Sequence, residues 1–212
     1  DPGKKKTLYP CHLGIYFYGR FEEYLFEKIR DSIEHIFPEF FYSIVNLGNF
    51  DFSPKMFSKG TKQEFEDFDD TKKKVDLHPT NKFYQILINK RIENRLDMIA
   101  AITDLPLYSS INSDIHFLFG EANMKHEVCI VSSLKLKNEF YEKPKRKELF
   151  EERAIKEILH EIGHLILGFQ HCNNEDCIMK FCKDIKDVDE KTIRLCKDCQ
   201  NKLEIVRKNF NF

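Results

Sequence analysis

The residues best able to do chemistry lie between positions 160 and 199. His160, Glu161 and His164 form an H-E-x-x-H pattern. A four-residue separation puts both imidazoles on one face of a helix, where they can share a zinc ion. A catalytic zinc usually takes three protein ligands and keeps a fourth position for water, whose pKa it lowers. Glu161 could accept a proton from that water, and a pair of ordinary surface histidines is the plain alternative.

A further imidazole follows the same segment. Gly168 is the type of residue that ends a helix, and His171 comes three positions later. This spacing is expected if the chain turns beneath the metal and supplies a third ligand. Glu175, Asp176 or a thiolate are alternative third ligands with weaker motif support.

Five of the seven cysteines crowd into positions 172–199. Clustering and an odd count favour a metal site over a disulfide framework, and they favour a reducing compartment. The C-x-x-C pair has the spacing of a structural tetrahedral zinc site, and a redox pair is the rival reading. Four thiolates could close such a site: Cys172, Cys177, Cys196 and Cys199. Cys182 is then a spare, either a small buried residue or a replacement for Cys177.

The stretch from His160 to Cys199 resembles the signature of archaemetzincins, a branch of the metzincin metallopeptidases. The resemblance implies two Zn²⁺ ions per chain, one catalytic and one structural. It implies that the general base is Glu161, that the catalytic zinc ligands are His160, His164 and His171, and that the structural zinc ligands are Cys172, Cys177, Cys196 and Cys199. Met179 would lie in the Met-turn, a hydrophobic floor under the catalytic metal. The alternative, that Met179 simply packs in the core, predicts nearly the same position.

The chain departs from that pattern in two places. Residues 165–167 stand between His164 and Gly168 where the pattern has two residues. One additional helical residue rotates the exit by about 100°, so the loop must re-aim or a π-bulge must absorb it. Phe181 stands where some metzincins supply a tyrosine, so the developing oxyanion would be stabilised mainly by the metal.

The pattern from Lys145 to Leu167 is helical, because it opens after Pro144 and stops at Gly168. An apolar stripe runs along one side of this segment, made by Ile155, Leu159, Ile162 and Ile166. The two histidines point the opposite way. They face either a cleft or water.

Shorter elements precede that helix. Strands are predicted at Leu13–Tyr18, Met98–Thr103, Ile115–Phe119 and Val128–Ser132, and helices at Phe21–Phe37 and Phe83–Arg95. The order predicts an α/β (α+β) fold with a mixed sheet flanked by helices. Asp51 to Thr80 is charged and irregular, which favours a long surface loop with solvated charge runs.

Two subdomains are expected. Residues 1–168 form an N-terminal α/β unit that includes the active-site helix (about 145–167), and residues 169–212 form a small zinc-stabilised C-terminal unit with the Met-turn and the four cysteines. Phe117 to Ala122 resembles the family strand that precedes the active-site helix. In metzincins this edge strand binds extended substrate by backbone pairing.

Composition limits the partners. Lys and Arg number 34 against 35 Asp and Glu, a net charge of −1, so no global field favours nucleic acid or an acidic membrane. No uninterrupted apolar stretch approaches the roughly 18 residues of a membrane span, and Asp1 to Pro10 lacks a signal-peptide core. We therefore expect a soluble, cytoplasmic protein. Because the chain starts at Asp1 rather than Met, a removed export signal stays open.

Zinc-dependent hydrolysis of peptide bonds, with a peptide or protein as substrate, is the leading functional hypothesis. The alternative is a catalytically weak or inactive zinc-stabilised peptide-binding protein. A nucleic-acid-binding zinc finger is a third hypothesis, and the balanced charge weighs against it. The oligomeric state and the cleavage specificity are left open.

Overall fold

A five-stranded sheet lies at the centre of the computed structural model, which describes residues 7–50, 61–66, 72–112 and 117–211. Its strand order is β2-β1-β5-β8-β7. The strands are β1 (Cys11–Tyr18), β2 (Phe41–Phe50), β5 (Met98–Thr103), β7 (Gly120–Asn123) and β8 (Val128–Ser132). The pairs from β2 to β8 are parallel, whereas β7 is antiparallel to β8. β2 and β7 are therefore the two edges of this sheet.

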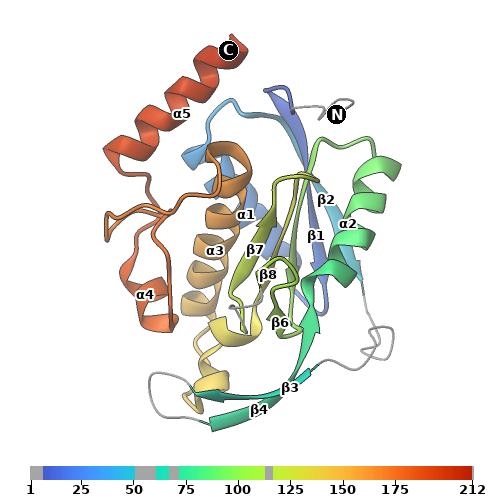
Figure 1. The fold of residues 1–212 in the computed structure, drawn as a ribbon, viewed down its shortest axis with the longest axis vertical. Helices are drawn as coiled ribbons and strands as arrows, with labels where there is room; N and C mark the ends of the chain where they lie inside the picture. Colours follow the sequence, from blue (N-terminus) through green and yellow to red (C-terminus); the bar gives the residue numbers. More distant parts are fainter. Residues whose placement is uncertain (1–6, 51–60, 67–71, 113–116, 212) are drawn as a thin grey trace.

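Helices cover both faces of the sheet (Figure 1). α1 (Glu23–Ile36) and α3 (Lys147–Leu167) pack on one face, and α2 (Thr80–Glu93) packs on the other. In β5, Met98 and Ala100 join the core under α1 and α3, while Ile99 and Ala101 join the core under α2. Strands that are covered on both sides are apolar at every position. The prediction of a mixed sheet flanked by helices is confirmed.

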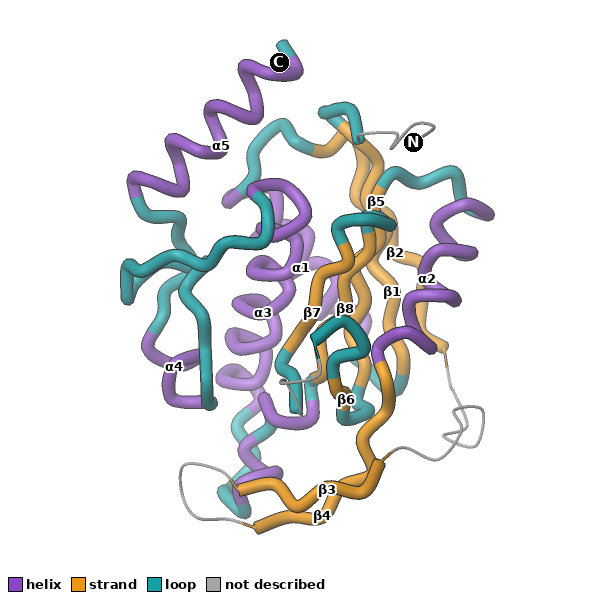
Figure 2. The backbone as a smooth tube through the Cα atoms, viewed as in Figure 1, coloured by secondary structure: helices purple, strands orange, loops and turns teal. Residues whose placement is uncertain are grey.

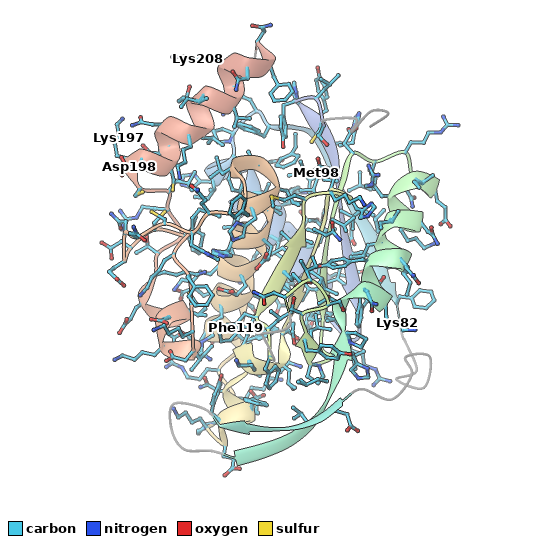
Figure 3. The ribbon with its side chains drawn as sticks, in the orientation of Figure 1. Lys82, Met98, Phe119, Lys197, Asp198 and Lys208 are labelled. Carbon is cyan, nitrogen blue, oxygen red and sulfur yellow. The ribbon has the colours of Figure 1, made fainter. Side chains whose placement is uncertain are left out.

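Two short 3₁₀ turns, Leu134–Leu136 and Asn138–Tyr141, lead from β8 into α3. After α3 the chain runs through α4 (Ile185–Glu190) and α5 (Lys197–Phe210) beside α3, away from the sheet (Figure 2). α5 begins at Lys197 and Asp198, and Lys208 lies near its C-terminal end (Figure 3). Among the described residues, no helix has the length and apolar character that crossing a membrane requires.

The segment that follows residue 168 shares its core with the rest of the chain. Ile178, Met179, Val188 and Leu203 belong to the same buried cluster as the residues of α1 and α3. The division into units 1–168 and 169–212 stays a prediction.

The expectation of a long loop over Asp51 to Thr80 is wrong for the part that the structure describes. β3 (Thr61–Glu66) and β4 (Lys72–Pro79) form an antiparallel pair, and β4 continues in parallel with β6 (Leu107–Tyr108). The register puts Glu64 opposite Lys74 and Glu66 opposite Lys72. A charged stretch of sequence can therefore belong to paired strands. Residues 51–60 and 67–71 of the predicted loop lie outside the described residues.

The predicted strand at Ile115–Phe119 is also misplaced. Its first two residues lie outside the described part of the chain, and the next three are not in a strand. β7 begins at Gly120, and the peptide N–H of Leu118 instead donates to the carbonyl of Leu107, 3.0 Å away. Irregular pairing of residues 117–119 with neighbouring segments replaces a continuous ladder there.

Candidate metal centre and active site

Three imidazoles meet at the C-terminal half of α3. The Nε2 atoms of His160 and His164, one helical turn apart, lie 3.0 Å from each other. His171 comes from the loop after α3, and its ring centroid lies 5.3 Å from that of His160 and 4.8 Å from that of His164. One ring nitrogen of each residue lies within 4.8 Å of the others. Tetrahedral Zn–N bonds of 2.0–2.1 Å separate ligand nitrogens by about 3.3 Å, so this donor set fits zinc.

The outer nitrogens of the two helical histidines are held by the backbone. His160 Nδ1 lies 2.8 Å from the carbonyl oxygen of Ile178, and His164 Nδ1 lies 2.9 Å from that of Gly168. A carbonyl can only accept, so each Nδ1 carries the proton and each Nε2 presents a lone pair. Burial lowers the pKa of both residues, and it lowers the pKa of His171 to about 4. All three imidazoles are therefore neutral near pH 7.

The end of α3 explains how the additional residue before the glycine is accommodated. α3 stays α-helical to Leu167, with no π-bulge, and Gly168 then adopts φ 100° and ψ 178°. This combination of positive φ with extended ψ is readily available only to glycine. The Gly168 N–H still donates to the His164 carbonyl at 3.0 Å. The loop is thus re-aimed at one residue, and His171 reaches the other two imidazoles.

The alternative third ligands lie elsewhere. Glu175 is 80% exposed and forms an ion pair of 2.5 Å with Lys180. Neither Glu175 nor Asp176 belongs to the group of residues whose ligand atoms converge at the histidines.

The histidine face of α3 borders a cavity of about 250 Å³. His160 and His164 are only 5% and 7% exposed, so the alternative that this face simply meets water is wrong. The loops after α3 cover the histidine face of this helix. The cavity is lined by Phe117 to Ala122, Met124, Glu157, His160, Glu161, His164, Phe169, His171, Phe181, Cys182, Lys183 and Lys191.

Glu161 lies between the cavity and the edge strand β7. A Cβ added to Gly120 would come 2.6 Å from Glu161 Oε1, so the strand backbone and the carboxylate are in close approach. Burial raises the pKa of Glu161 well above its ordinary value, and the neighbouring Glu157 adds to this, whereas Lys191 lowers it. A cation held by the three imidazoles would act in the same direction as Lys191 and favour the carboxylate.

A buried ion pair that the sequence did not reveal also lines this cavity. Lys191 Nζ lies 2.7 Å from Glu157 Oε1, and their side chains are 0% and 4% exposed. Although burial opposes the charge on Lys191, Glu157 keeps its pKa raised. The position of Glu157 beside the site was predictable from the sequence, because Glu157 lies three residues before His160 on the same face of α3. Lys191, more than 20 residues beyond the helix, carries no local signal.

Four sulfur atoms form a second group. The Sγ atoms of Cys172, Cys177, Cys196 and Cys199 lie within 4.8 Å of one another, and those of Cys172 and Cys196 are 3.5 Å apart. Tetrahedral Zn–S bonds of 2.3 Å separate ligand sulfurs by about 3.8 Å, so this set also fits zinc. Burial opposes ionisation of Cys196, but hydrogen bonds from the Cys199 backbone and neighbouring thiols leave its pKa lowered. The seven cysteines are all free thiols.

Cys182 takes no part in that sulfur group. It is half-buried rather than fully buried, and it lines the cavity near Lys191. Cys177 therefore keeps its expected place in the set of four.

Met179 is buried against α3 next to the helical histidines. It is 1% exposed and packs against α3 at Gly163, and its carbonyl accepts from the Cys172 N–H at 2.8 Å. Phe181, two residues later, contacts the ring of His171 edge-on, with centroids 5.0 Å apart. The segment that carries Cys177 thus also contacts the histidine group, through the Ile178 carbonyl and the Phe181 ring.

Two imidazoles on an H-E-x-x-H helix, a third from the following loop, a methionine buried against that helix and an adjacent sheet edge match the class that the sequence resembles, the metzincin metallopeptidases. The family model described as Peptidase family M54 matches residues 12–205, and the chain belongs to this family.

Relatives and solved structures agree with that membership. The chain is 38% identical over 122 residues to an archaemetzincin of Methanocaldococcus jannaschii, covering 58% of this chain and 66% of the relative. It is 40% identical over 106 residues to the archaemetzincin of Pyrococcus furiosus, covering 50% and 53%. These alignments span between half and two thirds of the curated relatives.

The fold is similar to the crystal structure of an archaemetzincin from Methanopyrus kandleri, with a TM-score of 0.68 and 19% identity over 100% of this chain and 99% of that one. It is also similar to a zinc-dependent peptidase from Methanocorpusculum labreanum, with a TM-score of 0.68 and 22% identity over 90% and 99%.

Proposed function

We propose that this chain is a zinc-dependent metallopeptidase whose catalytic zinc is held by His160, His164 and His171. The observation that carries the proposal is the convergence of three imidazoles, two of which have Nδ1–H fixed by backbone carbonyls. Partners on the outer nitrogen orient ligand histidines and raise their basicity. Without a metal, the Nε2 lone pairs of two buried, neutral imidazoles would face each other 3.0 Å apart with no proton between them.

We further propose a structural zinc on Cys172, Cys177, Cys196 and Cys199, which gives two Zn²⁺ per chain. Support comes from the spacing of the four sulfurs, which fits tetrahedral coordination.

Zinc bound at the histidines would polarise the scissile carbonyl and activate an adjacent water. Glu161 acts as the general base: its carboxylate accepts a proton from the attacking water and delivers it to the leaving amine. Enclosure of Glu161, which is 4% exposed, strengthens its electrostatic interactions and restricts competing water.

The proposed substrate is a peptide or protein in an extended conformation. β7 pairs with β8 on one side, and no other strand of the described residues pairs with its outer side, so that edge is suited to strand addition. The near-zero net charge gives nucleic acid no general attraction. A cytoplasmic location stays a prediction.

A catalytically weak peptide-binding protein is the second candidate, favoured by Phe181. This residue contacts His171 and offers no phenol to an oxyanion. The metal would then be the main source of transition-state stabilisation.

Substitution of Glu161 by Gln separates the two candidates. The wild type, loaded with zinc, is incubated with a peptide library and the products are identified by mass spectrometry, so that both exopeptidase and endopeptidase cleavage are seen. Loss of the base should lower the cleavage rate by about 10²–10⁴-fold, while both zinc ions stay bound.

Glu175→Gln is the matched control, because Glu175 is 80% exposed and outside the histidine group. It should cleave at the wild-type rate. A wild type that carries two zinc ions but releases no product would favour the binding protein. Wild-type cleavage by the Glu161→Gln variant would remove Glu161 as the base.

A further inference from the structure

The edge strand β7 sends alternate side chains to opposite faces of the sheet. Gly120 faces α3, where its backbone closely approaches Glu161, and Ala122 packs on the same side against the core under α3. Glu121 lies between them and points the other way, toward α2. One half-buried carboxylate on β7 thus reaches across the sheet from the proposed catalytic centre.

Three hydroxyl groups donate to this carboxylate. Thr80 Oγ1 and Tyr84 Oη each donate to Glu121 Oε1 at 2.6 Å, and Ser109 Oγ donates to Oε2. Thr80, Tyr84 and Ser109 are 0%, 4% and 5% exposed. Hydrogen bonds to an ionised group are stronger than neutral ones, so the carboxylate anchors β7 to the start of α2 and to the segment after β6.

The hydroxyl lone pairs are themselves engaged by backbone groups. Thr80 Oγ1 accepts from the Ser110 N–H at 3.0 Å, and Ser109 Oγ accepts from the N–H groups of Ile111 and Asn112 at 3.1 and 2.8 Å. Each hydroxyl has only one proton to donate. Both lone pairs of Ser109 Oγ are therefore in use, and its proton is directed to Glu121 Oε2, which acts as an acceptor.

β7 is a short edge strand. It is four residues long, and within the part of the chain that the structure describes β8 is its one strand partner. Its backbone borders the cavity from Gly120 to Ala122, and Gly120 touches Glu161. Loosening of β7 would therefore act first on the edge that borders the cavity, where an extended peptide would bind, whereas Glu161 is carried by α3.

We propose that Glu121 is a positioning residue that fixes the free edge of β7 for binding of an extended peptide. The effect on the KM for peptides rests on the proposed function. The anchoring of β7 does not, so the two can be tested separately.

Glu121→Gln keeps the shape of the side chain but removes its charge and replaces one acceptor oxygen by an NH₂ group. Backbone amide exchange at Gly120 to Asn123 should rise by roughly tenfold or more, since a hydrogen bond to a charged group is lost, while exchange in α3 and the two bound zinc ions stay unchanged. With a peptide that the wild type cleaves, KM should rise by roughly tenfold and kcat should change little.

Ser109→Ala removes one of the three donors and should raise exchange in β7 in the same direction, which keeps the test decisive if Glu121→Gln folds poorly. Glu93→Gln, an exposed α2 residue paired with Lys90, is the control and should match the wild type. Unchanged exchange in β7 in both test variants would overturn the proposal. A fall in kcat with zinc loss would also overturn it, because that pattern indicates general destabilisation. If the wild type cleaves no peptide, the proposed function has failed, and exchange alone still decides the anchoring.

Discussion

At the residue scale, the position of single protons and single methyl groups decides whether the site can work. The carbonyls of Ile178 and Gly168 fix the tautomers of His160 and His164, and this leaves both Nε2 lone pairs for a metal. Gly120 has no side chain, and this makes room for the carboxylate of Glu161 beside the strand.

Gly120→Ala should therefore impair the proposed catalysis without removing metal. The new Cβ would lie 2.6 Å from Glu161 Oε1, so the carboxylate must move. A displacement of about 1 Å at a reacting group can lower kcat by as much as 10²-fold. Steady-state kinetics with a peptide cleaved by the wild type would measure kcat, and elemental analysis would verify two zinc ions. A variant that keeps the wild-type kcat would show that this close contact does not position the base.

At the element scale, the loop between α3 and α5 links the two groups of metal-binding residues. His171 directly precedes Cys172, and Cys177 directly precedes Ile178, whose carbonyl orients His160. The Ile178 N–H donates to the Arg194 carbonyl at 2.8 Å, close to the second cysteine pair. Closing the sulfur group around a metal would hold this loop in the form that the histidines require.

Cys196→Ser should for this reason weaken zinc binding at the histidines as well as at the sulfur group. Loss of the partners that orient ligand residues typically lowers metal affinity by about 10–100-fold. Competition with a chromophoric chelator would measure both affinities. Cys182→Ser is the matched control, because Cys182 lies outside the sulfur group, and it should bind two zinc ions as the wild type does. If Cys196→Ser binds one zinc with unchanged affinity, the two sites are independent.

At the scale of the whole molecule, charge pairs join the C-terminal segment to α3. Arg153 in α3 makes a bidentate pair with Asp189 in α4, with distances of 2.6 and 2.7 Å, and Lys156 donates to the Asp189 carbonyl at 3.1 Å. Arg153 is 6% exposed and Asp189 is 36% exposed. The packing of this segment over α3 also encloses the cavity.

Asp189→Asn should lower the free energy of unfolding by about 2 kcal/mol, because a buried guanidinium loses its charged partner, with allowance for the solvent exposure of Asp189. For a chain of this size the melting temperature should fall by about 4–8 °C. Thermal unfolding of the zinc-loaded protein would measure it. Glu190→Gln is the control on the same helix, since its pair with Lys186 is exposed and 3.7 Å long. Equal melting temperatures for the two variants would contradict the prediction.

Sequence patterns alone determined the elements whose signal is local. The apolar run of β5 and the helical spacing of His160 and His164 depend on neighbours in the chain, and both were predicted with the right bounds or close to them. The cysteine spacing and the three histidines likewise identified the groups that the fold brings together.

Only the tertiary structure decided what depends on residues far apart in the chain. The pairing of β3 with β4 depends on which residues of the two strands lie opposite each other, and the composition of one strand does not specify this. The re-aimed loop at Gly168, the Glu157–Lys191 pair and the three hydroxyls around Glu121 each join segments from different elements. The spacing of residues in the sequence indicates which side chains share one helix face. Contacts between different elements depend on packing, and packing exists only in the folded chain.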